Sequence, residues 1–187
     1  MNQMARIVAA PVDFKARFTA EEFVQIAEAS AQQDIRLELI DGELERMSPP
    51  MGNHVFHQTG VIAALLQAVR GTGLKAVVEV GIDLGTDTIV TADAALLISN
   101  AAGNRFFLPE DLKLVVEVAE ATLDRDLGPK RIKYAVAGVP EYWVVDGGHS
   151  AVHVFRAPRD GEYTETDLVR FGQPLPVPGT DATITLD

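Results

Sequence analysis

The stretch Leu112-Lys113-Leu114-Val115-Val116-Glu117-Val118-Ala119 decides the class of fold. It is rich in β-branched side chains and shows no regular alternation of polar and apolar residues. Such a run is typical of a strand that is buried on both faces, in the middle of a mixed or parallel sheet. Glu117 is the exception within it, because an isolated buried carboxylate is costly unless it is paired or bound to a metal. The stretch therefore predicts a central strand that carries one acid.

The segments on either side of this strand predict the rest of a core. Further strands are expected over Lys75–Val80, Ile89–Ile98 and Glu141–Val145. A helix with Asn53 as its N-cap is expected to run to about Val69, before these strands. A second helix, from Gly128 to Ala137 with Pro129 in its first turn, is expected before the last strand. The order helix, three strands, helix, strand favours an α/β or α+β fold with a mixed central sheet.

The flanking regions predict smaller elements. Thr19-Ala20-Glu21-Glu22 has the spacing of a capping box, so a helix is expected from Ala20 to about Gln32. Asp41-Gly42 between short apolar runs predicts a hairpin. Antiparallel strands are expected over Ala151–Phe155 and near Tyr163–Arg170, and the Pro-rich chain after Pro174 is expected on the surface. We expect a single domain over 1–187, with a core at 53–146, a helix–hairpin unit at 19–47 and a meander at 151–187.

Composition narrows the function. The 187 residues contain no cysteine and carry a net charge of −11. Disulfides, thiolate metal sites and cysteine nucleophiles are therefore excluded. An acidic chain is not expected to coat nucleic acid by bulk charge, although a nuclease needs only a local basic groove. The apolar run Ile62–Leu66 is far too short to span a bilayer. We expect a cytoplasmic protein without a membrane segment.

Acids inside the apolar strands are the first candidate site. Asp93, Glu117 and Glu79 lie on three successive predicted strands. They could converge on one divalent cation, because carboxylate oxygens are the ligands that Mg²⁺ prefers. The alternative is that each acid lies at a strand end or points to solvent.

Basic residues and histidines provide two further candidates. The segment Asp124–Tyr134 contains four basic residues, and a lysine there could stabilise a phosphoryl transition state. The alternative is a solvated helix face. A zinc site is a separate hypothesis, since two histidines share one face of the first core helix and two others flank the final hairpin. These are His54, His57, His149 and His153.

Longer motifs make the chain recognisable. They are Glu38-Leu39-Ile40-Asp41-Gly42-Glu43-Leu44, Met47-Ser48-Pro49-Pro50 with His54, Val116-Glu117-Val118, Arg125-Asp126-Leu127-Gly128-Pro129-Lys130-Arg131, and Gly138-Val139-Pro140-Glu141-Tyr142-Trp143-Val144-Val145-Asp146. Over residues 20–154 the chain resembles the Uma2 family of endonucleases, within the PD-(D/E)XK, restriction-endonuclease-like superfamily. The superfamily core is helix, three strands, helix, strand, which agrees with the predicted order.

The resemblance implies roles for individual residues. Asp93 matches the metal-binding Asp, and Glu117 matches the acid of the (D/E)XK element. The lysine expected at Ala119 has moved to the following helix, where Lys130 takes its place. The remaining implied roles are a catalytic acid at Glu38, a metal-binding carbonyl at Val118, accessory groups at Glu79, His54 and Glu120, and nucleic-acid contacts at Arg125, Arg131 and Lys133. The expected cofactor is Mg²⁺, for which Mn²⁺ would substitute.

Three substitutions depart from the family pattern. Thr91 and Ala92 stand where Arg and Pro are common before the metal-binding Asp, and Glu120 adds an acid after the (D/E)XK element. The resemblance implies a Mg²⁺-dependent endonuclease that hydrolyses DNA. The alternative is a catalytically degenerate nuclease fold that acts as a binding or regulatory protein. By analogy, a homodimer would suit cleavage of both DNA strands.

Overall fold

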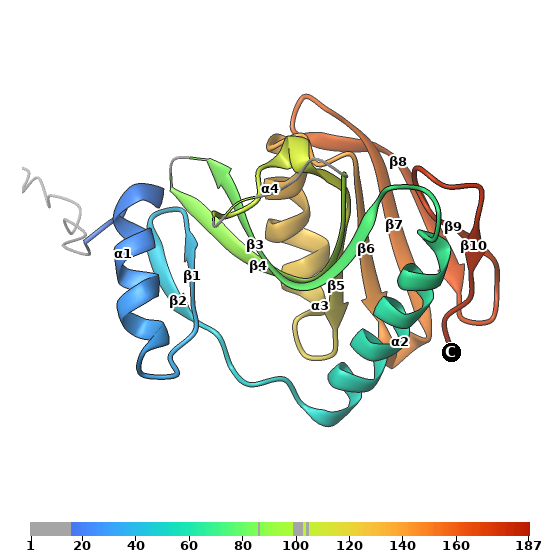
Figure 1. The fold of residues 1–187 in the computed structure, drawn as a ribbon, viewed down its shortest axis with the longest axis horizontal. Helices are drawn as coiled ribbons and strands as arrows, with labels where there is room; N and C mark the ends of the chain where they lie inside the picture. The colour runs from blue at the N-terminus through green and yellow to red at the C-terminus, as the bar shows by residue number, and fades with distance from the viewer. Residues whose placement is uncertain (1–15, 86, 99–102, 104) are drawn as a thin grey trace, which may run out of the picture.

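The structure is a computed structural model that describes residues 16–85, 87–98, 103 and 105–187. Figure 1 shows a central sheet with helices on both of its faces. The elements are, in chain order, α1 (Ala20–Ala31), β1 (Leu37–Ile40), β2 (Glu43–Arg46), α2 (Gly52–Ala68), β3 (Lys75–Gly85), β4 (Thr88–Leu97), η1 (Pro109–Asp111), β5 (Leu112–Ala119), α3 (Leu123–Arg125), η2 (Asp126–Lys130), α4 (Arg131–Val136), β6 (Glu141–Asp146), η3 (Gly147–His149), β7 (Ala151–Arg159), β8 (Glu162–Arg170), β9 (Leu175–Pro176) and β10 (Thr183–Ile184).

The main sheet confirms the predicted class. Its strand order is β2-β1-β4-β5-β6-β7-β8, and β3 pairs with β4 as well. β5 and β6 are parallel, while the other strand pairs are antiparallel, so the sheet is mixed. The elements α2, β3, β4, β5, α4 and β6 follow the predicted core order. A helical connection between β5 and β6 is what a parallel pair requires.

Each face of the sheet has its own apolar core. On one face, Val61 and Leu65 of α2 pack against inward residues of β4, β5 and β6. On the other face, Tyr134 of α4 packs against Val115, Tyr142 and neighbouring residues. Strand side chains of β5 alternate between these two layers, so Glu117, between Val116 and Val118 of the α2 layer, points to the α4 side. Glu117 therefore faces the helical segment that carries Lys130.

The C-terminal segment differs from its predicted place on the surface. Four of its apolar side chains are at most 7% exposed and belong to the α2 core. They are Leu175, Val177, Ile184 and Leu186. Their spacing of two residues within each pair directs them to one side of the β9–β10 ribbon. Burial of that apolar side, rather than the Pro-rich composition, determines where the segment lies.

Two predicted helix starts were wrong. α2 begins at Gly52, with Met51 rather than Asn53 as its N-cap, and no side chain caps it. The helical segment before β6 begins at Leu123, five residues earlier than expected, and Pro129 lies inside a π turn. Proline has no amide hydrogen and crowds the carbonyl four residues earlier, so a wider turn accommodates it. Within the described residues, no helix combines the length and apolar character that crossing a membrane requires.

Candidate active site

The candidate site lies where β4 changes its neighbour along one edge. Near its start, β4 pairs with β1 through Leu39 and Ile89. From Ala94 onward the same edge pairs with β5, beginning at Val116. β1 and β5 therefore diverge along β4, and the intervening residues lack a continuous ladder on that edge. We call this place the fork.

Two carboxylates replace ladder hydrogen bonds at the fork. The Thr91 amide donates to Glu38 Oε1 at 2.8 Å. The Val118 amide donates to Asp93 Oδ2 at 2.7 Å. Backbone donors that would otherwise be unsatisfied thus fix both acids. The local chain geometry explains why acids occupy these positions.

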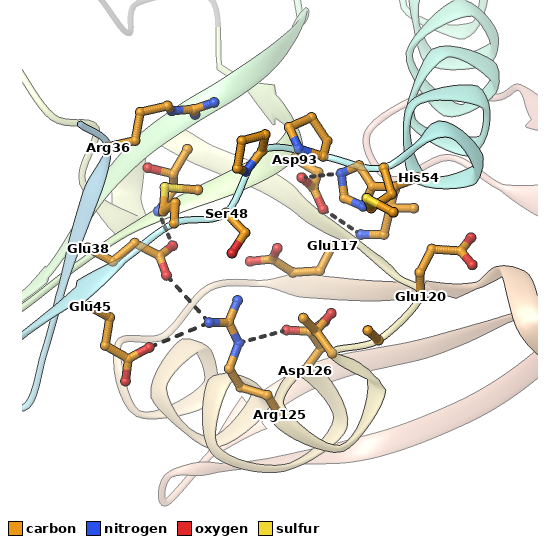
Figure 2. A pocket seen from close by; sticks show the side chains of 18 of the residues that line it. Arg36, Glu38, Glu45, Ser48, His54, Asp93, Glu117, Glu120, Arg125 and Asp126 are labelled. Carbon is orange, nitrogen blue, oxygen red and sulfur yellow. Dashed lines mark hydrogen bonds and ion pairs between the residues drawn. The ribbon is translucent and has the colours of Figure 1, made fainter. Parts of the chain in front are cut away.

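A pocket of about 290 Å³ opens at the fork. Figure 2 shows acidic side chains converging on it from β1, β4, β5 and the helical segment after β5. Its lining includes nine of the residues singled out from the sequence, namely Glu38, His54, Glu79, Asp93, Glu117, Val118, Glu120, Arg125 and Lys130. Residues from β1, α2, β3, β4, β5 and the segment after β5 therefore meet at one place.

Asp93 and Glu117 meet across adjacent strands. Continuing the antiparallel register one step beyond Ala94 and Val116 places the two acids opposite each other. Both side chains line the pocket and point into it. Asp93 Oδ1 also lies 3.1 Å from His54 Nε2. This hydrogen bond, with burial opposing it, raises the pKa of His54.

Glu117 belongs to a buried network with Lys130. Lys130 Nζ donates to Glu117 Oε1 at 2.9 Å and to Glu38 Oε1 at 3.4 Å. Burial raises the pKa of Glu117 to about 8, against the attraction of Lys130. Burial acts to lower the pKa of Lys130, but the attraction of Glu117 and Glu38 outweighs it and raises that pKa. Lys130 is therefore an ammonium ion at neutral pH.

The predicted accessory acids hold other partners. Glu120 Oε1 lies 2.8 Å from His57 Nδ1. Glu79 pairs with Arg36 and accepts a hydrogen bond of 3.2 Å from Gln58. It lies on β3, which borders β4 on the edge away from β5, and its φ of +54° marks an irregularity in that pairing. Asp93 and Glu117 thus converge as expected, while Glu79 stands at the rim.

The three predicted nucleic-acid contacts are in different places. Arg125 lines the pocket, with its guanidinium 3.8 Å from Glu38 and 3.5 Å from Glu45. Arg131 pairs with Glu162 at 3.1 Å and lies over the Phe155 ring. Lys133 pairs with Asp41. Neither Arg131 nor Lys133 lines the pocket, so of the three only Arg125 is placed beside the acids.

The histidines do not form one cluster. His54 pairs with Asp93 and His57 with Glu120, whereas His149 and His153 both face Asp146, at 2.8 and 3.7 Å. In the part of the chain that the structure describes, no group of three or more His, Cys, Asp or Glu residues is arranged to hold a metal. The separate placement of these pairs does not support the zinc hypothesis.

Two residues near Glu117 and Lys130 were given no site role from the sequence, although both lie in the segment Asp124–Tyr134. Asp126 is 2% exposed and accepts a hydrogen bond from Thr122, but its Oδ1 has no hydrogen-bond partner among the described residues. Tyr134 is fully buried and donates to Glu117 Oε1 at 2.8 Å. Tyr134 follows Lys130 by four residues, one helical turn, and that spacing was a signal that both side chains face the same way.

Comparison with known proteins gives the family of the chain. The model of the Uma2 family, described as "Putative restriction endonuclease", matches residues 20–187. The chain belongs to the Uma2 family. The structure is also similar to a crystal structure from Anabaena variabilis ATCC 29413, described as a putative nuclease belonging to DUF820. The TM-score is 0.70 at 19% identity, over 86% of this chain and 89% of that one.

The structural likeness at this identity concerns the fold alone. No curated protein matches the sequence. The Uma2 assignment spans every residue of the pocket, from Arg36 to Lys130. Membership of a family described as a putative restriction endonuclease indicates a nuclease.

Proposed function

We propose that this Uma2 chain is a Mg²⁺-dependent endonuclease that hydrolyses phosphodiester bonds of DNA. The observation that carries the proposal is the meeting of Asp93 and Glu117 in one pocket, with Lys130 held against Glu117. DNA is the substrate implied by the family's description as a restriction endonuclease. We expect the protein to act in the cytoplasm, and a two-fold dimer would bring two pockets to the two strands of a duplex.

The donor set of the pocket fits Mg²⁺. Asp93 and Glu117 offer carboxylate oxygens. The Val118 amide faces Asp93, and the carbonyl of a strand residue points to the same edge as its amide, so this carbonyl is a third oxygen donor. Mg²⁺ is held in proteins by one or two carboxylates together with water and substrate phosphate, and Mn²⁺ accepts the same ligands. When bound, such an ion supplies a water of lowered pKa and neutralises charge on the scissile phosphate.

The surrounding residues position and balance these acids. Lys130 keeps its proton, so its role is to stabilise negative charge rather than to accept a proton. Glu38 holds Lys130 and the Thr91 amide together. His54 fixes one oxygen of Asp93 while the Val118 amide fixes the other. Arg125, which is 40% exposed, would contact a phosphate of the bound strand.

Nicking of supercoiled plasmid DNA in Mg²⁺ tests the proposal. Asp93→Ala and Lys130→Met are each expected to reduce the rate by roughly 1000-fold, because each removes a charge at the reacting phosphate. Glu141→Gln is the matched control. Glu141 is a buried acid of β6 that bonds to Trp143 and Arg156, and it does not line the pocket.

Two results would contradict the proposal. Equal nicking by wild type and Asp93→Ala would show that the activity comes from another site or a contaminant. A wild type that neither nicks DNA nor binds Mn²⁺ would favour the degenerate, regulatory alternative. Glu120 would then pair with His57 and take no part in cation binding.

A further inference from the structure

Tyr134 contacts Glu117 of the candidate cation site from the α4-side core. Its side chain is fully buried, and its hydroxyl donates to Glu117 Oε1 at 2.8 Å. Lys130 Nζ donates to that same oxygen at 2.9 Å. One oxygen of the carboxylate is therefore held by two donors from successive turns of the same helical segment.

The other carboxylate oxygen of Glu117 has no hydrogen-bond donor from the residues that the structure describes. It is also absent from the fully buried polar atoms that lack a partner, so it reaches the pocket space. In Figure 2 the Glu117 carboxylate lies in the middle of the pocket, between Asp93 and Arg125. Two donors on Oε1 thus leave Oε2 as the oxygen presented to a ligand.

The Tyr134 ring is itself held in place. It packs against Tyr142 with the ring centroids 4.8 Å apart. The Tyr142 hydroxyl donates to the carbonyl oxygen of Asp126 at 3.0 Å, in the π turn that ends at Lys130. The two tyrosines therefore connect the acid of β5 with the turn that carries its lysine. Neither ring can rotate freely, because both are fully buried in the α4-side core.

We infer that Tyr134 is a positioning residue of the cation site, which orients Glu117 so that its free oxygen faces a divalent ion. The inference rests on the proposed function. Groups that hydrogen-bond to a metal-binding carboxylate orient it, and their removal commonly weakens metal binding by about 10–100-fold. Lys130 places a positive charge beside the same oxygen, whereas the hydroxyl of the closely packed Tyr134 ring fixes the orientation of the carboxylate.

Tyr134→Phe tests this role, with Tyr163→Phe as the matched control. Tyr163 is also buried in the same core, and its hydroxyl donates to the Val139 carbonyl at 2.9 Å rather than to an acid. Each variant loses one buried hydroxyl. Isothermal titration with Mn²⁺ is expected to show about tenfold weaker binding for Tyr134→Phe and wild-type binding for Tyr163→Phe. The kcat for nicking should fall with Mn²⁺ affinity, and the KM for DNA should not change.

The outcomes separate the two proposals. Wild-type Mn²⁺ affinity in folded Tyr134→Phe overturns the positioning role, whatever the activity of the site. Absence of Mn²⁺ binding that depends on Asp93 in the wild type overturns the proposed function and this inference with it. An equal loss of Mn²⁺ affinity in both tyrosine variants would also overturn the inference, since it would reflect general loosening of the core.

A measurement on the wild type covers the case in which Tyr134→Phe does not fold. The chain has three tyrosines, and the other two donate to backbone carbonyls. Mn²⁺ bound to Glu117 changes the charge on the acceptor of Tyr134 alone. A tyrosine difference absorption spectrum is therefore expected on adding Mn²⁺, and it should persist in Tyr163→Phe. A flat spectrum under saturating Mn²⁺ would overturn the role.

Discussion

Two buried acids lie at opposite ends of β5, and their surroundings differ. Asp111 directly precedes the strand, and its carboxylate accepts hydrogen bonds from Arg105, at 2.7 and 3.1 Å, and from the Leu108 amide at 2.8 Å. Those bonds, Arg105 first, lower the pKa of Asp111 against the effect of burial. Glu117, near the other end, is surrounded by further acids, and burial raises its pKa to about 8.

The comparison separates a structural acid from one suited to a ligand. Both oxygens of Asp111 are occupied by donors, so the ionised form is satisfied within the protein. Glu117 has donors on one oxygen, while Asp93, Asp126 and Glu38 disfavour its charge. A divalent cation would contact the Glu117 oxygen that has no donor and would balance the charge of the neighbouring acids. The chain therefore carries destabilising electrostatics at Glu117 that a bound ion would relieve.

The largest expected difference concerns cation binding. Glu117→Gln removes a charged ligand and is expected to weaken Mn²⁺ binding by at least about 100-fold, more than the loss of an outer hydrogen bond. Asp111→Asn, the same chemical change at the other end of β5, should leave Mn²⁺ affinity unchanged. Titration calorimetry on both variants measures this. Equal weakening in the two variants would mean that the comparison describes stability and not a binding site.

Glu117→Gln is expected to have a smaller effect on the thermal stability of the metal-free protein, and here the substitution should stabilise. The folded protein keeps a proton on Glu117 up to pH about 8, while the unfolded chain releases it near pH 4.3. The native state thus binds more protons between these values, so stability falls as the pH rises through them. The stability of Glu117→Gln does not fall in this way as the pH rises, because the amide carries no titrating proton. Its amide oxygen would still accept hydrogen bonds from Lys130 and Tyr134. In EDTA its Tm should exceed that of wild type by about 2–4 °C at pH 8, with little difference at pH 4.5. A lower Tm at pH 8 would refute the account of Glu117.

The smallest expected effect is the acid response of Asp111. Its pKa is lowered in the folded state, so its contribution to stability is present above about pH 4 and lost as the pH falls further. Asp111→Asn places an amide group against N–H donors and should lower the Tm by about 1–2 °C at pH 7. The difference from wild type should shrink toward pH 3. Thermal melts across this range measure it, and a difference that does not change with pH would assign the effect to packing.

The strands could be predicted because their signals are local. The predicted bounds of Leu112–Ala119 match β5, and Ile89–Ile98 is one residue from β4 at each end. β3 continues to Gly85, beyond the expected Val80, because pairing with β4 extends through residues that have weak strand signals of their own. Apolar runs identify buried strands, but they do not show where a partner strand prolongs them.

The site could be predicted in part. Asp93, Glu117 and Lys130 stood out as acids in apolar strands and a lysine in a matching motif, and the structure brings them together. The change of partner along β4 depends on residues far apart in the chain, such as Leu39 and Ile89, so no local pattern contains it. The contact between Glu38 and Lys130 joins positions 92 residues apart. The π turn around Pro129 depends on the packing of the helix against the sheet, and proline alone predicted a helix start.

A crystal structure of the protein grown with MnCl₂ tests the central claim most directly. Anomalous scattering at the manganese edge would locate the ion independently of any assumption about its ligands. The account predicts one peak or two within the pocket, bridging Asp93 and Glu117, with Tyr134 and Lys130 still bonded to the opposite oxygen of Glu117. A pocket without an anomalous peak under saturating Mn²⁺, or a peak located only at Asp146 and its two histidines, would contradict it.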